Sequence, residues 1–124
     1  MGNKKSLGKG LDLLLKANSN QVRTTEEIDL TRLQLLFEQA VAEDEKGQIF
    51  EAYYLFRRVI DSLEACLGLK IPGSAKLYSE ACNNVAIILY ESGNVLGAVN
   101  YLEQALKIWP DNGTARENLS AISK

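Results

Sequence analysis

The stretch 92-SGNVLGAVNYLEQALKIWPDN-112 places small residues and a proline at fixed intervals. Ala98, Ala105 and Pro110 follow Gly93 at offsets of 5, 12 and 17 residues. Bulky apolar residues recur between them every three or four positions, which is typical of one face of an α-helix. A small residue lets a helix approach its neighbour closely, and a bulky one there would strain the packing. The stretch therefore predicts a helix that contacts a helix before it and another after it.

The same periodicity runs through most of the chain and predicts five helices and no strand. The helices are expected over residues 25–46, 50–67, 74–91, 95–109 and 114–123. Thr24–Glu27 and Thr114–Glu117 each pair a hydroxyl with a carboxylate three residues later, which predicts a capping box at both places. Cys66 and Cys82 lie inside helical stretches, where buried thiols are expected rather than a disulfide. The fold class is therefore expected to be all-α.

A shift of 46 residues, which lays Gly47 on Gly93, aligns the first half of this helical body with the second. Small residues meet small and bulky meet bulky in the pairs Leu36–Cys82, Ala40–Ala86, Ala52–Ala98, Phe56–Leu102 and Val59–Ala105. An internal repeat of this kind predicts two antiparallel helical hairpins, with one extra helix after them. The residues expected to pack the repeats are Ala40, Gly47, Ala52, Ala86, Gly93, Ala98, Ala105 and Pro110.

Residues 79–112 resemble a tetratricopeptide repeat (TPR), whose glycine, alanine and proline positions fall on Ala86, Gly93, Ala98, Ala105 and Pro110. Residues 33–60 resemble a second repeat, although Glu43 and Val59 depart from the family's pattern and no proline closes it. The resemblance implies a domain over residues 24–124. It contains one repeat at about 25–67, another at about 74–110 and a capping helix at about 114–123. The shift of 46 exceeds the family period of about 34, so the second helix or its loop is expected to be longer than usual.

The resemblance implies a non-enzymatic adaptor, because such repeats line a groove that holds a partner peptide or helix. The groove residues expected by register are Gln34, Phe37, Glu38, Val41, Asp44, Glu45, Glu80, Asn83, Asn84, Ile87, Tyr90 and Glu91. Asn84 matches a position that holds a C-terminal carboxylate in chaperone-binding members, but the accompanying lysines and arginines are missing here. An apolar and acidic lining favours a basic partner segment with an apolar face. The alternative is that these acids form only a solvated face.

The net charge of −2 is unevenly distributed. Residues 1–23 carry five basic residues and one acidic residue, whereas the remainder carries nine basic and fifteen acidic residues. The acidic body would repel phosphates, so it is not expected to bind nucleic acid. The chain has no histidine, no Gly-rich phosphate loop and no cysteine pair with zinc spacing. We therefore expect no catalytic residues, no metal and no cofactor.

Residues 1–23 are expected to form a flexible basic arm, and three interpretations of it stay open. The arm has no specific role, or Met1-Gly2 with Ser6 is an N-myristoylation signal that attaches the protein to a membrane in a eukaryotic cytosol. In the third, residues 7–15 resemble the N-terminal box of ParB chromosome-partitioning proteins, which contacts a ParA/MinD-like ATPase and stimulates ATP hydrolysis. The residues that carry this resemblance are Leu7, Gly8, Lys9, Gly10, Leu11, Leu14 and Leu15.

In the ParB interpretation Lys9 would be the stimulating cation and the leucines would dock on the ATPase. The DNA-binding parts of ParB are missing from this chain, so DNA partition is not implied. No apolar run approaches the length of a membrane-spanning helix, and a cytoplasmic location is expected. Two repeats make a short stack. Either the long second helix and the C-terminal helix complete its core, or the protein forms a homodimer.

Overall fold

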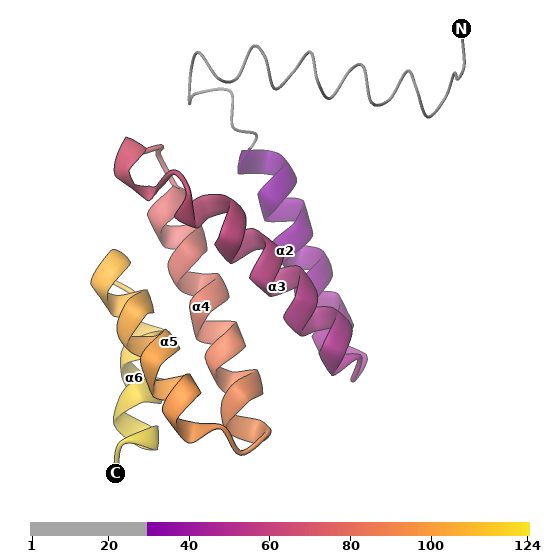
Figure 1. Ribbon diagram of the computed structural model, residues 1–124, viewed down its shortest axis with the longest axis vertical. Helices are drawn as coiled ribbons and strands as arrows, with labels where there is room; N and C mark the ends of the chain where they lie inside the picture. The colour runs from indigo at the N-terminus through magenta and orange to yellow at the C-terminus, as the bar shows by residue number, and fades with distance from the viewer. Residues whose placement is uncertain (1–29) are drawn as a thin grey trace, which may run out of the picture.

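The computed structural model describes residues 30–124, and all its regular elements are helical (Figure 1). Over this range the all-α prediction is confirmed. The elements in chain order are α2 (Leu30–Glu45), α3 (Ile49–Glu64), the short 3-10 helix η2 (Leu67–Leu69), α4 (Ser74–Glu91), α5 (Val95–Ile108) and α6 (Gly113–Ile122).

Two parts of the sequence interpretation lie outside these residues. One is the start of the first helix, with its capping box at Thr24–Glu27. The other is the whole arm, with Leu7, Gly8, Lys9, Gly10, Leu11, Leu14 and Leu15.

Two tight turns of the same geometry join α2 to α3 and α4 to α5. In the first, the N–H groups of Gly47 and Gln48 donate to the carbonyls of Asp44 and Glu43 at 3.0 and 2.8 Å. These two bonds form a Schellman motif, which requires a left-handed residue after the helix, and Gly47 has φ +83°. Glycine adopts this conformation without a steric penalty, so it ends the helix and reverses the chain.

The second turn repeats the first. Gly93 has φ +92°, its N–H donates to Tyr90, and the N–H of Asn94 donates to Leu89 at 2.8 Å. Here the N-cap is also made by a side chain, because Asn94 Oδ1 accepts from the Gly97 N–H at 2.8 Å. Each turn therefore folds two consecutive helices back on one another as a hairpin (Figure 1).

The helices form a single row in which each packs mainly against the one before it and the one after it. In Figure 1 the row runs from α2 and α3 through α4 to α5 and α6. The central α4 contributes the most buried residues, including the fully buried Val85 and Cys82. The core is thus continuous between the two hairpins.

The pairs aligned by the 46-residue shift occupy equivalent places in this core. In four of the five pairs both members are 0% exposed: Ala40–Ala86, Ala52–Ala98, Phe56–Leu102 and Val59–Ala105. The fifth pair joins half-buried Leu36 to fully buried Cys82. Pro110 lies in the exposed turn that follows α5.

The extra length of the first repeat is divided between a helix and a loop. α3 has 16 residues against 14 in α5, and residues 65–73 connect it to α4, whereas residues 109–112 connect α5 to α6. The prediction that the second helix reaches residue 67 was therefore wrong, because α3 ends at Glu64. The chain instead turns at Ala65–Cys66, where Cys66 is buried and its N–H donates to the Leu63 carbonyl at 2.9 Å.

The capping box predicted at Thr114–Glu117 was also wrong. α6 begins at Gly113 and its N-cap is Asn112, whose Oδ1 accepts from the Ala115 N–H at 3.0 Å. Asparagine is among the best N-cap residues. Thr114 therefore lies inside the first turn of the helix and is exposed.

Both cysteines are free and buried. Burial raises the pKa of Cys66, and burial raises the pKa of Cys82 to about 12, so both remain thiols at neutral pH. Within residues 30–124, no helix combines the length and the apolar character that a bilayer crossing requires.

Candidate partner-binding groove

An open pocket of about 310 Å³ lies where α2, α4 and the start of α6 meet. Its lining residues are Phe37 and Val41 from α2, Glu80, Asn83 and Asn84 from α4, and Asn112 and Thr114 at the start of α6. Five of these seven were predicted as groove residues from their register on the two aligned helices. The structure thus brings the middle of α2 and the middle of α4 to one hollow.

One wall of the pocket is apolar. Phe37 and Val41 are both half-buried, so each contributes to the core and also faces the pocket. The Phe37 ring stands edge-on to Phe56, with centroids 5.5 Å apart and planes at 65°. Because edge-to-face contacts fix the orientation of an aromatic ring, the fully buried Phe56 holds this wall in place.

The opposite wall is a short chain of amides. Asn118 Nδ2 of α6 donates to Asn83 Oδ1 at 2.9 Å, and Asn83 Nδ2 donates to Asn84 Oδ1 at 3.3 Å. Asn83 is buried, so its amide serves mainly to tie α4 to α6. Half-buried Asn84 uses its Oδ1 in this bond. Its Nδ2 group remains as a donor on this wall for a carbonyl or carboxylate of a ligand.

The end of the pocket near α6 depends on a buried polar network. Asn112 Nδ2 donates to Ser79 Oγ at 2.9 Å, and Ser79 Oγ donates to the Ala105 carbonyl at 2.7 Å. Ser79 is fully buried and Asn112 nearly so. Because Asn112 also caps α6, both ends of its amide are used, and its role is to fix the start of α6 against α4.

Sequence reasoning missed Asn112 and Thr114 as pocket residues. Thr114 was assigned to a capping box, and that assignment hid the stronger signal two residues earlier. Asn112 is of a residue type strongly preferred at an N-cap, and it stands directly before the helix begins. Its contact with Ser79, 33 residues away, has no counterpart in the local sequence.

The remaining seven predicted groove residues lie outside this pocket. They are Gln34, Glu38, Asp44 and Glu45 on α2, and Ile87, Tyr90 and Glu91 on α4. Gln34 Nε2 donates to Glu38 Oε2 at 3.3 Å in an exposed pair within α2. Ile87 is half-buried and the other six are exposed. The pocket itself therefore contains one carboxylate, that of Glu80, and the other acids surround it.

The pocket combines an apolar wall with a few polar side chains. Its polar groups are amides, one hydroxyl and one carboxylate, and its apolar wall is suited to a side chain such as leucine. Comparisons of the chain with models of protein families, with curated proteins and with solved structures find no match.

Proposed function

We propose that the protein is a non-enzymatic adaptor of TPR type, located in the cytoplasm. In this proposal residues 33–112 form two repeats, α6 caps the stack, and the pocket between α2, α4 and α6 holds a segment of a partner protein. The preferred partner segment is basic with an apolar face, because Phe37, Val41 and the carboxylate of Glu80 line the same pocket.

The observation that carries the proposal is the equivalence of the two hairpins. A single shift of 46 residues in the sequence aligns two Schellman turns with left-handed glycines and four pairs of fully buried side chains. Hairpins that repeat in sequence and bury the same positions against their neighbours are the unit of helical solenoid proteins, which generally serve as binding scaffolds. The lining of the pocket by five register-predicted residues supports the same function.

The groove is tested with paired variants used as bait. Asn84→Ala removes the amide of the polar wall, and Glu103→Gln on the exposed surface of α5 is the matched control. We expect the full chain and the control to retain the same partner and Asn84→Ala to lose it, with the folded spectrum of all three unchanged. Equal retention by both variants would argue against the groove as the binding site.

The arm is proposed to contact a ParA/MinD-like ATPase through Lys9 and the leucines that follow it. A cation positioned beside transferring phosphates stabilises the charge that develops there. We expect the protein to accelerate ATP hydrolysis by its cognate ATPase and Lys9→Ala to do so much less. An ATPase that responds equally to both proteins would exclude this role for the arm.

The sequence Met1-Gly2 with Ser6 supports a second candidate, a lipid-anchored TPR adaptor. One acyl chain next to basic residues gives reversible membrane attachment. The intact mass of the protein from its native source separates the candidates, because myristoylation removes Met1 and adds one acyl group.

A further inference from the structure

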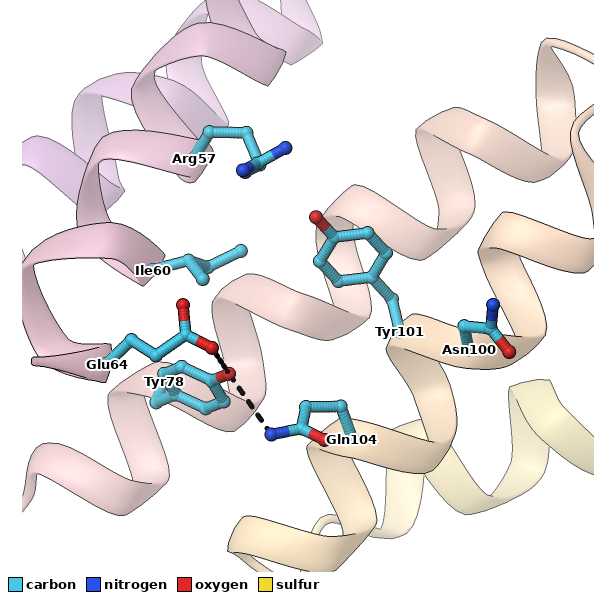
Figure 2. Close-up of a pocket in the computed structure, with 7 residues that line it drawn as sticks. All are labelled: Arg57, Ile60, Glu64, Tyr78, Asn100, Tyr101 and Gln104. Carbon is cyan, nitrogen blue, oxygen red and sulfur yellow. Dashed lines mark hydrogen bonds between the residues drawn. The ribbon is translucent and has the colours of Figure 1, made fainter. Parts of the chain in front are cut away.

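A second pocket, of about 230 Å³, opens between α3, α4 and α5. Its seven lining residues are Arg57, Ile60 and Glu64 from α3, Tyr78 from α4, and Asn100, Tyr101 and Gln104 from α5 (Figure 2). None of them lines the groove described above, which is formed by α2, α4 and α6. The adaptor function does not require this pocket, so it needs its own explanation.

Arg57 is held in position at one end of the pocket. Its Nη1 donates to Tyr53 Oη at 3.3 Å, and the guanidinium carbon lies 5.9 and 6.0 Å from the ring centroids of Tyr53 and Tyr101. Both distances are within the range of a cation–π contact. Arginine loses much side-chain entropy when it binds a ligand, and a guanidinium already fixed between two rings loses less.

The hydrogen-bonding capacity of Arg57 is largely unused. Its Nη2 lies 3.6 Å from Asp61 Oδ1, in a mostly exposed contact that is too long for a good hydrogen bond. Its Nε is buried and has no partner within residues 30–124. A buried cationic donor without a partner is rare in folded proteins, so the hydrogen bonds of this guanidinium are incomplete in the described residues.

Tyr101 supplies a second donor at the same end. Figure 2 shows its hydroxyl on the side of the pocket where the Arg57 guanidinium lies. Burial raises the pKa of Tyr101, more than the nearby Arg57 charge lowers it, so the phenol keeps its proton at neutral pH. A guanidinium and a neutral phenol that face one space are both donors, and together they match an acceptor with negative charge.

The opposite end of the pocket has the reverse polarity. Tyr78 Oη donates to Glu64 Oε2 at 3.4 Å and accepts from Gln104 Nε2 at 3.3 Å, as the dashed lines in Figure 2 show. Arg57 and Glu64 are seven residues apart on α3, which corresponds to about 10 Å along the helix. The pocket therefore has a cationic end at Arg57 and an anionic end at Glu64, with Ile60 between them (Figure 2).

We propose that this pocket is a second protein-binding site, in which Arg57 and Tyr101 hold an aspartate or glutamate side chain of a partner. Its volume is below the roughly 300–1,000 Å³ of typical small-molecule sites and suits one or two side chains. With Asp61 next to it, the single cation of Arg57 balances the one charge of a carboxylate better than the double charge of a phosphate. The guanidinium fork can bind such a carboxylate through two parallel bonds. The incoming group displaces the weak contact with Asp61, since exposed pairs of that kind contribute little.

The site is tested by NMR titration of the ¹⁵N-labelled full chain. The probe is the side chain alone, as N-acetyl-glutamate methylamide, and the control is N-acetyl-glutamine methylamide at the same ionic strength. We expect saturable shifts of the Arg57 Nε–H and of the Asn100 and Tyr101 amides with the carboxylate only. No saturation up to about 50 mM, or equal shifts with the amide, would overturn the proposal, because the guanidinium and the phenol acting together should give millimolar affinity.

Two pairs of variants locate the binding. Arg57→Gln removes the cation of the pocket. Arg58→Gln removes its neighbour, which stacks on Tyr54 at 5.8 Å and does not line the pocket. We expect the carboxylate response to disappear in the first and to persist in the second. Tyr101→Phe, which removes only the hydroxyl donor, should lower the affinity for the carboxylate probe about tenfold. A response that survives Arg57→Gln, or that is lost with Arg58→Gln, would assign the binding to the exposed surface of α3 instead.

Discussion

α2 and α4 are aligned by the internal repeat, yet the structure treats them differently. Ten residues of α4 are buried, whereas in α2 only Ala40 is buried. Three aligned pairs show the contrast: Leu35–Ala81, Gln39–Val85 and Ala42–Ile88. The α2 member of each pair is exposed, Leu35 by 61%, and the α4 member is buried.

The difference follows from position in the row of helices. α4 has α3 on one side and α5 on the other, whereas within residues 30–124 α2 packs mainly against α3 and touches α4 only slightly. The same repeat position is therefore core in the middle of the row and surface at its end. Gln39 and Ala42 of α2 are polar or small where the aligned α4 residues are Val85 and Ile88, whereas Leu35 of α2 and Phe50 of α3 are exposed apolar residues. The place of a helix in the stack therefore decides whether its outer face is buried or exposed to solvent.

The largest expected effect contrasts two phenylalanines of α3. Phe56 is fully buried and Phe50 is 92% exposed. We expect Phe56→Ala to lower the free energy of unfolding by about 3–5 kcal/mol, because it removes a large buried ring and leaves a cavity. Phe50→Ala should change it by less than about 0.5 kcal/mol. Urea unfolding measures both, and similar losses would mean that the exposed end is covered in solution.

The aligned pair Gln39–Val85 can be exchanged. Val85→Gln buries an amide in the fully buried centre of α4, and we expect a loss of about 2–4 kcal/mol in the free energy of unfolding. Gln39→Val, at the matching position of α2, should cost less than about 0.5 kcal/mol. Thermal unfolding of the two variants compares them directly. A comparable cost for Gln39→Val would show that the two positions are not as different as their burial indicates.

At the other end of the row, Asn112 caps α6 and joins its start to Ser79 of α4. Asn112→Ala removes the N-cap and leaves Ser79 without its donor partner, so we expect a loss of about 1–3 kcal/mol in the free energy of unfolding. The control is Asn94→Ala, which removes an exposed cap of α5 and should cost about 1 kcal/mol or less. If the two losses in urea unfolding are equal, the buried contact with Ser79 adds nothing to the cap.

The smallest expected effect on stability comes from the Cys82 thiol, which is silent at neutral pH and acts only in alkaline solution. Cys82 aligns with Leu36 of α2. Its pKa is about 12 in the folded protein against an ordinary 9.0, so the unfolded chain loses this proton first. The contribution of this thiol to the free energy of unfolding is therefore fully present below pH 9. Above pH 9 the free energy of unfolding falls by about 1.4 kcal/mol per pH unit because of this one group. Urea unfolding at pH 8 and pH 10 measures the slope, and Cys82→Ala should make it shallower. An unchanged slope would assign the alkaline loss to other groups, such as Tyr78, whose pKa burial also raises.

Much of this architecture was predictable because it depends on local signals. Glycines that must be left-handed ended two helices, and the range predicted for α4 agrees with the structure from Ser74 to Glu91. The predicted end of α3 and the predicted start of α6 were wrong. The helix was extended beyond Glu64 to residue 67, and the capping signal of Asn112 was passed over for that of Thr114.

The groove was predictable in part for the same reason. Register places residues on a helix face, and so the sequence alone was enough to group Phe37, Val41, Glu80, Asn83 and Asn84. Register does not say at which point along a helix a pocket lies. The other seven predicted residues therefore fall outside it. The Arg57 pocket was missed entirely, since its residues come from three helices and share no sequence motif.

The sequence by itself determined the helices, the two glycine turns and the repeat of small residues, because each depends on backbone conformation or on side-chain size within a few positions. Only the tertiary structure decided which copies of the repeat are buried and where amides, tyrosines and an arginine from separate helices converge. These depend on which helix lies beside which, over distances that a local pattern does not encode.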